Sequence, residues 1–175
     1  MDYKDIIKMD QLIFQFPFSK KYYEQDFFVS SNNFSAFRLI EEWPTWPGKW
    51  LNIFGDSGSG KTHLAKILEK KINNTKLIDA RKINNEIVQE LETLECLIID
   101  SFDNNIEENL LYSILNQSKQ LENYILITSN LSIKDTKFGL KDLQSRMNSF
   151  LQFGIELPTD DLLKVIISKT LVRKT

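Results

Sequence analysis

The sequence of 175 residues has very few of the side chains that usually build covalent or metal-based sites. It contains one cysteine and one histidine, so their number excludes an internal disulfide and a metal site made of cysteines or histidines. Cys96 lies in an apolar run, which favours a reduced thiol in the core. No apolar run approaches the roughly 18 residues of a membrane span, and the first residues, MDYKDIIKMDQ, are charged where a signal peptide is apolar. These absences favour a cytoplasmic protein without membrane contact.

The sequence also lacks an excess of charge of either sign. It has 22 Lys and Arg against 24 Asp and Glu, a formal net charge of −2. A basic excess across the domain is the usual sign of a nucleic-acid-binding protein, so direct binding to DNA is disfavoured. With 42% hydrophobic and 26% charged residues, the composition is that of an ordinary globular domain.

From residue 50 onward, short apolar runs alternate with segments of helical length. Strands are predicted at 51–54, 76–79, 96–99, 124–128 and 152–157, and helices at 61–72, 85–94, 107–121, 140–149 and 160–171. Short and continuously apolar strands are typical of a parallel sheet with helices on both faces. The sequence therefore predicts an α/β fold built from βαβ units. A further helix, capped near Ser30–Asn33, is expected to end near Glu42.

The strongest motif is Gly55-Asp-Ser-Gly-Ser-Gly-Lys-Thr62, which matches G-x-x-x-x-G-K-[ST] between a predicted strand and a predicted helix. Glycines let the backbone N–H groups of such a P-loop turn toward phosphate oxygens, and the helix N-terminus adds partial positive charge. Lys61 is expected to reach the β and γ phosphates, and the Thr62 hydroxyl to ligate Mg²⁺. The alternative is a plain glycine-rich turn.

Two polar residues follow later strands. A P-loop needs a carboxylate at the end of a neighbouring strand to hold Mg²⁺, and Asp100 ends the run CLIID. Asn130, in ITSN, falls at the carboxyl edge of the sheet, where it is placed to position water near a γ-phosphate. Each has a plainer alternative, a polar residue in a turn after a strand. Ser101 stands where a second acid often follows, which argues against fast intrinsic hydrolysis.

This order of motifs, with Arg146 in LQSRM before the fifth predicted strand, resembles the AAA+ ATPase family over about residues 22–170. The resemblance is greatest to the branch that contains the replication initiator DnaA and its relative Hda. It implies a P-loop NTPase fold of three layers, αβα, with a five-stranded parallel sheet in the order 5-1-4-3-2. It also implies a flexible N-terminal arm at 1–20, a nucleotide-binding domain at 21–158 and the start of a truncated helical lid at 159–175.

The resemblance further implies residue roles. The catalytic set would be Lys61, Asp100, Asn130 as sensor 1, and Arg146 as an arginine finger acting in trans; Thr62 and Asp100 would hold Mg²⁺. ATP or ADP would be bound by Phe27, Phe28, Val29, Gly55, Asp56, Ser57, Gly58, Ser59, Gly60, Lys61, Thr62 and His63. For Arg146 the alternative is a surface cation that favours the dipole of its helix.

The arm contains Gln11-Leu12-Ile13-Phe14-Gln15-Phe16, which resembles the Gln-Leu-x-Leu/Phe peptides that insert into the groove of the replicative sliding clamp. The expected contacts are made by Gln11, Leu12, Ile13, Phe14 and Phe16. An extended segment with apolar side chains at alternate positions suits such a groove. The alternative is a segment that folds back onto its own domain.

Two departures separate this sequence from DnaA-type initiators. Ala80–Glu95 has room for one helix where they carry a two-helix insertion that grips single-stranded DNA, and the sensor 2 arginine of the lid has no counterpart.

The resemblance therefore implies a regulator, with weak or no ATPase of its own, that docks on the clamp, associates with DNA only through it, and stimulates hydrolysis of DnaA-bound ATP. Two alternatives stay open: a DnaA-like ATPase or loader acting on DNA or protein, and an adaptor that binds nucleotide without hydrolysis. Assembly into a homo-oligomer is also left open.

Overall fold

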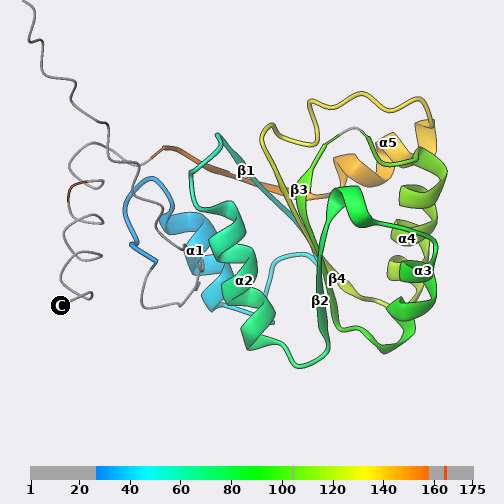
Figure 1. The fold of residues 1–175 in the computed structure, drawn as a ribbon, viewed down its shortest axis with the longest axis horizontal. Helices are drawn as coiled ribbons and strands as arrows, with labels where there is room; N and C mark the ends of the chain where they lie inside the picture. The colour runs from blue at the N-terminus through cyan, green and yellow to red at the C-terminus, as the bar shows by residue number, and fades with distance from the viewer. Residues whose placement is uncertain (1–26, 104, 158–163, 165–175) are drawn as a thin grey trace, which may run out of the picture.

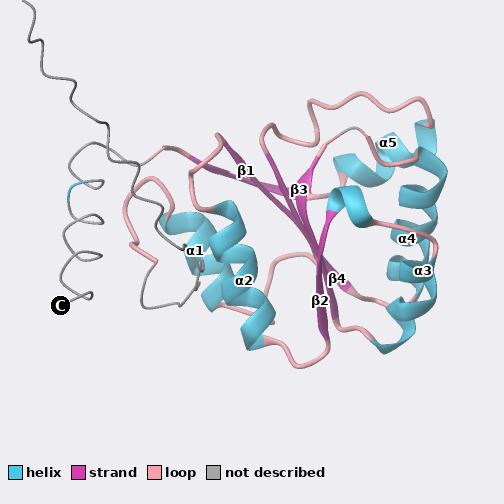
Figure 2. Ribbon diagram, in the orientation of Figure 1, coloured by secondary structure: helices cyan, strands magenta, loops and turns pink. Residues whose placement is uncertain are grey.

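The structure is a computed structural model that describes residues 27–103, 105–157 and 164. In this part of the chain, five strands form one sheet between two layers of helices (Figure 1 and Figure 2). The strands are β1 (Trp50–Gly55), β2 (Thr75–Asp79), β3 (Cys96–Phe102), β4 (Tyr124–Ser129) and β5 (Leu151–Ile155). The helices are α1 (Phe34–Glu41), α2 (Lys61–Lys71), α3 (Glu86–Glu90), α4 (Glu108–Gln120) and α5 (Lys141–Asn148), with short 3₁₀ turns η2 (Ala80–Lys82) and η3 (Leu91–Thr93).

The strand order is β2-β3-β4-β1-β5, and every pair is parallel. This confirms the predicted α/β class and the predicted order 5-1-4-3-2. Since all strands run the same way, their carboxyl ends lie at one edge of the sheet, which is where open α/β sheets bind ligands. The loop after β1 and the residues that end β3 and β4 therefore meet at that edge.

Each face of the sheet is covered by its own layer of helices. Helices α1 and α2 pack on one face, and α3, α4 and α5 on the other (Figure 1). The side chains of β3 alternate between the two layers, with Ile98 in the α1–α2 core and Leu97 and Ile99 in the opposite core. Cys96 is fully buried, as its apolar run predicts, and burial raises the pKa of its thiol.

The segment between β2 and β3 is less regular than the single helix predicted at 85–94. The side chain of Asn84 accepts a hydrogen bond from the backbone N–H of Glu86 at 3.0 Å, and α3 starts there. The chain then tightens into the 3₁₀ turn η3, where Asn123 Nδ2 donates to the carbonyl of Leu91 at 3.2 Å. A polar side chain from the neighbouring loop thus ends the helix early. The segment holds no two-helix insertion, as its length predicts.

Other element boundaries shift by a few residues. Strand β3 continues past Asp100 to Phe102 instead of ending at 99, and β5 spans Leu151–Ile155 instead of 152–157. The predicted arm at 1–20, with its clamp-binding peptide, lies outside the described residues, as does the predicted helix 160–171 apart from residue 164. Among the described residues, no helix is long and apolar enough to span a membrane.

Candidate functional site

The P-loop joins β1 to α2, as the motif predicts. Gly58 and Gly60 have φ values of +87° and +104°, in the left-handed region that favours glycine. At Gly55, a Cβ atom would lie only 2.1 Å from the backbone carbonyl oxygen of Ile155 in β5. The glycines of the motif are therefore required by the backbone geometry and by the approach of β5.

Lys61 lies inside this loop, with a relative exposure of 9%. Its ammonium donates to the carbonyl oxygens of Gly55 at 2.7 Å and Asp56 at 2.9 Å. Burial lowers the pKa of Lys61, while the carboxylates of Asp100 and Asp56 act in the opposite direction. A partly desolvated ammonium is a strong hydrogen-bond donor to anions.

Asp100 is close to the P-loop in space, although 38 residues separate it from Thr62. The hydroxyl of Thr62 donates to both carboxylate oxygens of Asp100, at 3.1 and 3.0 Å. A second hydroxyl, from the buried Thr128 of β4, donates to Asp100 Oδ1 at 2.5 Å. Sequence reasoning predicted the meeting of Asp100 with Thr62 and missed Thr128.

The oxygen atoms of Thr62 and Asp100 fit a magnesium ion. Mg²⁺ prefers hard oxygen ligands, and in phosphate sites it takes one or two from protein and the rest from phosphate and water. Within the described ranges, no group of three or more His, Cys, Asp or Glu residues is placed to hold a metal alone. Such a pair of protein oxygens suits an ion that is shared with a phosphate.

A cavity of about 670 Å³ opens over the P-loop. It is lined by Ser57, Gly58, Gly60, Lys61, Thr62, His63, Arg81, Ser101, Phe102, Asp103 and Asn130. Asn130 therefore shares the cavity with the P-loop, although it follows β4 and not β1. This agrees with the sequence, because a residue that follows a strand of a parallel sheet is expected at the carboxyl edge, where the P-loop also lies.

Arg81 is a cavity residue that sequence reasoning missed. It lies in η2, directly after β2, and its guanidinium binds both carboxylate oxygens of Asp79, at 2.8 Å from Nε and 2.5 Å from Nη2. Hydrogen bonding to Arg81 holds the pKa of Asp79 well below its usual range, and hydrogen bonding to Asp79 raises the pKa of Arg81. No motif marks this arginine; its place at the end of the second predicted strand is the one available signal.

The predicted adenine-side segment lies beside the P-loop. The ring of Phe27 stacks on Phe37 at 5.6 Å and meets the edge of His63 at 5.2 Å. A Cβ on Gly60 would come within 3.1 Å of the Phe27 ring, so ring and loop are in contact. Phe27, Phe28 and Val29 are not among the residues that line the 670 Å³ cavity. Their expected role in binding adenine stays a prediction.

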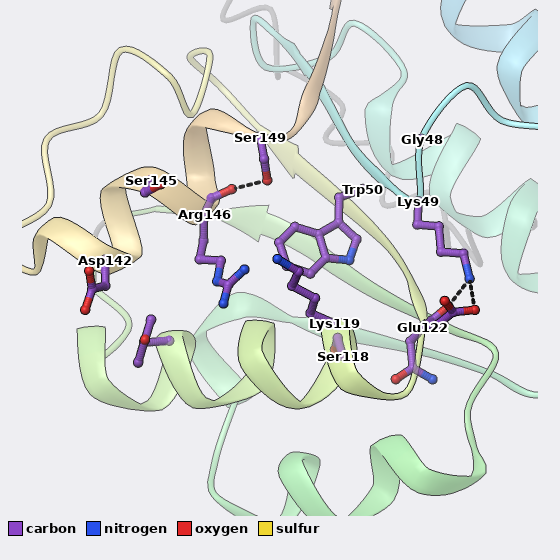
Figure 3. Close-up of a pocket in the computed structure, with 12 residues that line it drawn as sticks. Gly48, Lys49, Trp50, Ser118, Lys119, Glu122, Asp142, Ser145, Arg146 and Ser149 are labelled. Atoms are coloured by element: carbon purple, nitrogen blue, oxygen red, sulfur yellow. Dashed lines mark hydrogen bonds and ion pairs between the residues drawn. The ribbon is translucent and has the colours of Figure 1, made fainter.

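Arg146 lies at the other edge of the sheet, near the C-terminus of α5. Figure 3 shows its side chain extending from α5 toward α4, beside Trp50. It lines a second cavity of about 820 Å³, and its Nη2 donates to Asn116 Oδ1 on α4 at 2.9 Å. Trp50 begins β1, whereas the P-loop follows Gly55 at the end of that strand, roughly 17 Å away. The two cavities share no lining residue.

Comparison with known proteins identifies the family. The family model described as RNA helicase matches residues 51–142, which is more than half of the chain. The chain belongs to the RNA helicase family. The matched region of this family runs from β1 into α5 and includes the P-loop, Asp100 and Asn130. The P-loop lies inside this matched region, and the chain is also similar in sequence to a replication initiator.

One curated relative of this RNA helicase family member is the chromosomal replication initiator protein DnaA of Spiroplasma citri, 28% identical over 149 residues. The match covers 69% of this chain and 33% of that protein, so the chain spans about a third of the relative's length. Domain III of Thermotoga maritima DnaA has a TM-score of 0.74 at 23% identity, covering 91% of this chain and 77% of that one. AMPPCP-bound DnaA of Aquifex aeolicus has a TM-score of 0.69 at 20% identity, covering 89% and 56%. At these identities the structural matches establish the fold.

Proposed function

We propose that this chain is a nucleotide-binding, Hda-like regulator of replication initiation. It docks on the sliding clamp through Gln11–Phe16 and presents Arg146 to ATP held by DnaA, accelerating hydrolysis of that ATP. The position of Arg146 carries this proposal. An arginine at the edge of the sheet opposite its own P-loop is suited to a nucleotide on another protein.

The nucleotide of the chain itself, ATP or ADP, is held at the P-loop. Lys61 and the N–H groups of the loop bind the phosphates, and Phe27–Val29 lie on the adenine side. Thr62 and Asp100 hold Mg²⁺, which neutralises phosphate charge when bound. The AMPPCP named for Aquifex aeolicus DnaA supports a nucleotide of this class in the same fold.

Turnover of this nucleotide is slow. Ser101 lines the cavity at the position where a second carboxylate would orient water, and a hydroxyl group is not a base at neutral pH. Asn130 remains as the polar group that positions water. The chain thus keeps its nucleotide and acts on the nucleotide of a partner.

Arg146 is suited to act in trans by its hydrogen bonding as well as its place. Its described contact is the neutral amide oxygen of Asn116, and none of the ion pairs among the described residues includes it. Its charge is therefore available to a phosphate. An arginine supplied in trans accelerates phosphoryl transfer by about 10³- to 10⁵-fold.

Single-turnover hydrolysis of ATP bound to DnaA, measured with clamp loaded on DNA, tests this role. Arg146→Ala should reduce the stimulation by about 10³-fold or more, with nucleotide binding and clamp binding unchanged. Arg38→Ala is the matched control, because Arg38 is exposed on α1 and pairs with Glu42. It should stimulate like the wild type. Full stimulation by Arg146→Ala would remove the finger role.

A second candidate is an ATPase or loader of DnaA type that uses its own hydrolysis. The observation in its favour is the assembled P-loop edge, where Thr62 meets Asp100 and Asn130 lines the same cavity. This candidate requires ATP hydrolysis by the chain alone, lost in Lys61→Ala. The regulator requires DnaA for fast hydrolysis, and the two are separated by assaying the chain with and without DnaA.

A further inference from the structure

Thr128 is a fully buried threonine at the carboxyl end of β4, and its hydroxyl makes two hydrogen bonds to β3. It donates to Asp100 Oδ1 at 2.5 Å and accepts the backbone N–H of Ser101 at 2.9 Å. Both contacts join β4, which ends just before Asn130, to β3, which carries Asp100. The hydroxyl has no exposure to solvent, so these are its fixed partners in the described structure.

The register of β3 and β4 explains why a side chain is needed here. The strands pair as Ile99↔Ile127, and after an irregularity they pair again as Phe102↔Ser129. Two residues of β3, Asp100 and Ser101, thus lie opposite Thr128 alone, as in a β-bulge. Ser101 has a φ of +58°, in the left-handed region that is unfavourable for a residue with a Cβ. The Thr128 hydroxyl takes up the Ser101 N–H that the ladder leaves unpaired.

The two hydroxyl groups that donate to the Asp100 carboxylate differ in whether they can leave it. Thr62 belongs to the P-loop, and in the proposed site it turns its oxygen to Mg²⁺, so its bond to Asp100 is exchangeable. Thr128 is fully buried within the sheet and is not among the residues that line the P-loop cavity. One donor therefore remains on Asp100 when the other leaves.

We propose that Thr128 is a positioning residue for magnesium: its hydroxyl holds the Asp100 carboxylate, and the bulge that carries it, in the orientation that receives the ion. This inference rests on the proposed nucleotide and Mg²⁺ site. Residues that orient metal ligands typically affect metal affinity by 10- to 100-fold when changed.

Titration of the full chain with a fluorescent ADP tests the proposal, with Mg²⁺ at increasing concentration and separately in EDTA. In Thr128→Val, which removes the hydroxyl and keeps the shape, the Mg²⁺ concentration for half-maximal effect should rise by about 10-fold or more. ADP affinity in EDTA should stay within about two-fold of wild type, since the change acts through metal affinity. Thr128→Ser, which keeps the hydroxyl, should restore the wild-type response.

Thr75→Val is the matched control. It removes a buried threonine hydroxyl at the start of β2, one that has no hydrogen-bond partner within the described structure, and it should leave both titrations unchanged. Should Thr128→Val not fold, Thr128→Cys serves in its place, because a thiol of similar size is a weak donor.

An unchanged Mg²⁺ response in Thr128→Val would overturn the inference, and so would an equal loss of ADP affinity with and without Mg²⁺, which indicates a purely structural role. A wild-type chain that binds no ADP would instead overturn the proposed function itself. The two failures are therefore distinguishable in one set of titrations.

Discussion

Lys61 is the positively charged side chain of the P-loop. Its ammonium lies in the loop against two carbonyl oxygens, and burial lowers its pKa from the ordinary value of 10.5. Phosphate oxygens favour the charged form of an amine, so a bound nucleotide would raise that pKa again. Binding of the nucleotide and protonation of Lys61 are therefore linked.

This linkage predicts proton uptake on nucleotide binding at alkaline pH. Between the lowered pKa of the free protein and the raised pKa of the complex, the complex holds the extra proton, so affinity falls as pH rises through the lowered pKa. Calorimetry over a series of pH values below the ordinary lysine pKa of 10.5, in buffers of different ionisation enthalpy, measures the uptake. Lys61→Arg is the control, because its guanidinium stays charged and should show no uptake. Equal uptake by both proteins would contradict the prediction.

The sequence predicts the position of a site residue when a local pattern, such as a contiguous loop or the end of an apolar strand, determines that position. Lys61 and Thr62 belong to a contiguous loop, and Asp100 and Asn130 end strands whose parallel order brings them to one edge, so their meeting was predictable. Thr128 was not: in the run ILITS it reads as an ordinary strand residue. Its function as a donor depends on the irregular pairing of β3 with β4, which two strands determine together.

At the scale of elements, the end of β1 is the most constrained part of the site. Gly55 pairs with Ile155 of β5, and a Cβ on Gly55 would meet that carbonyl oxygen at 2.1 Å. The strand β5 therefore fixes where the P-loop begins. Gly58, in the middle of the loop, has open space around its Cα and only its φ of +87° resists a side chain.

These two glycines predict different losses of stability. Gly55→Ala should lower the free energy of unfolding by about 3 kcal/mol, because the backbone of β1 or β5 must move. Gly58→Ala should lower it by about 1 kcal/mol, the cost of a left-handed residue with a Cβ. Urea denaturation followed by circular dichroism measures both. A loss in Gly55→Ala no larger than that in Gly58→Ala would show that β5 does not constrain the loop.

Elements were predictable where burial alone decides them. The apolar runs at the centre of the sheet became β1, β3 and β4, which are largely buried because helices cover both faces. The edge strands β2 and β5 are only partly buried, and their shorter apolar runs still form strands. The segment 85–94 was not predictable, because its helix is ended by the amide of Asn123, 29 residues beyond Leu94 along the chain. A contact of that kind leaves no periodic signal in the local sequence.

At the scale of the whole molecule, the sheet separates two chemistries. The P-loop cavity opens at the carboxyl edge, and the cavity beside Arg146 opens at the amino edge, with β1 extending between them. A chain arranged in this way can keep one nucleotide and present its arginine to another. In the proposed function the N-terminal arm adds a third attachment, which brings Arg146 to DnaA on DNA.

That attachment gives the last prediction. Gln11→Ala with Leu12→Ala should abolish capture by the sliding clamp, because a polar anchor and an inserted apolar side chain are both lost. At low concentration the stimulation of DnaA should fall as well, since tethering raises effective affinity by about 10²- to 10⁴-fold. Raising the protein concentration should restore stimulation, because Arg146 is intact.

The control is Gln15→Ala, a like change outside the expected contacts, and this variant should be captured normally by the clamp. Undiminished capture of the double variant would remove the arm from the mechanism and leave Arg146 to find DnaA without the clamp.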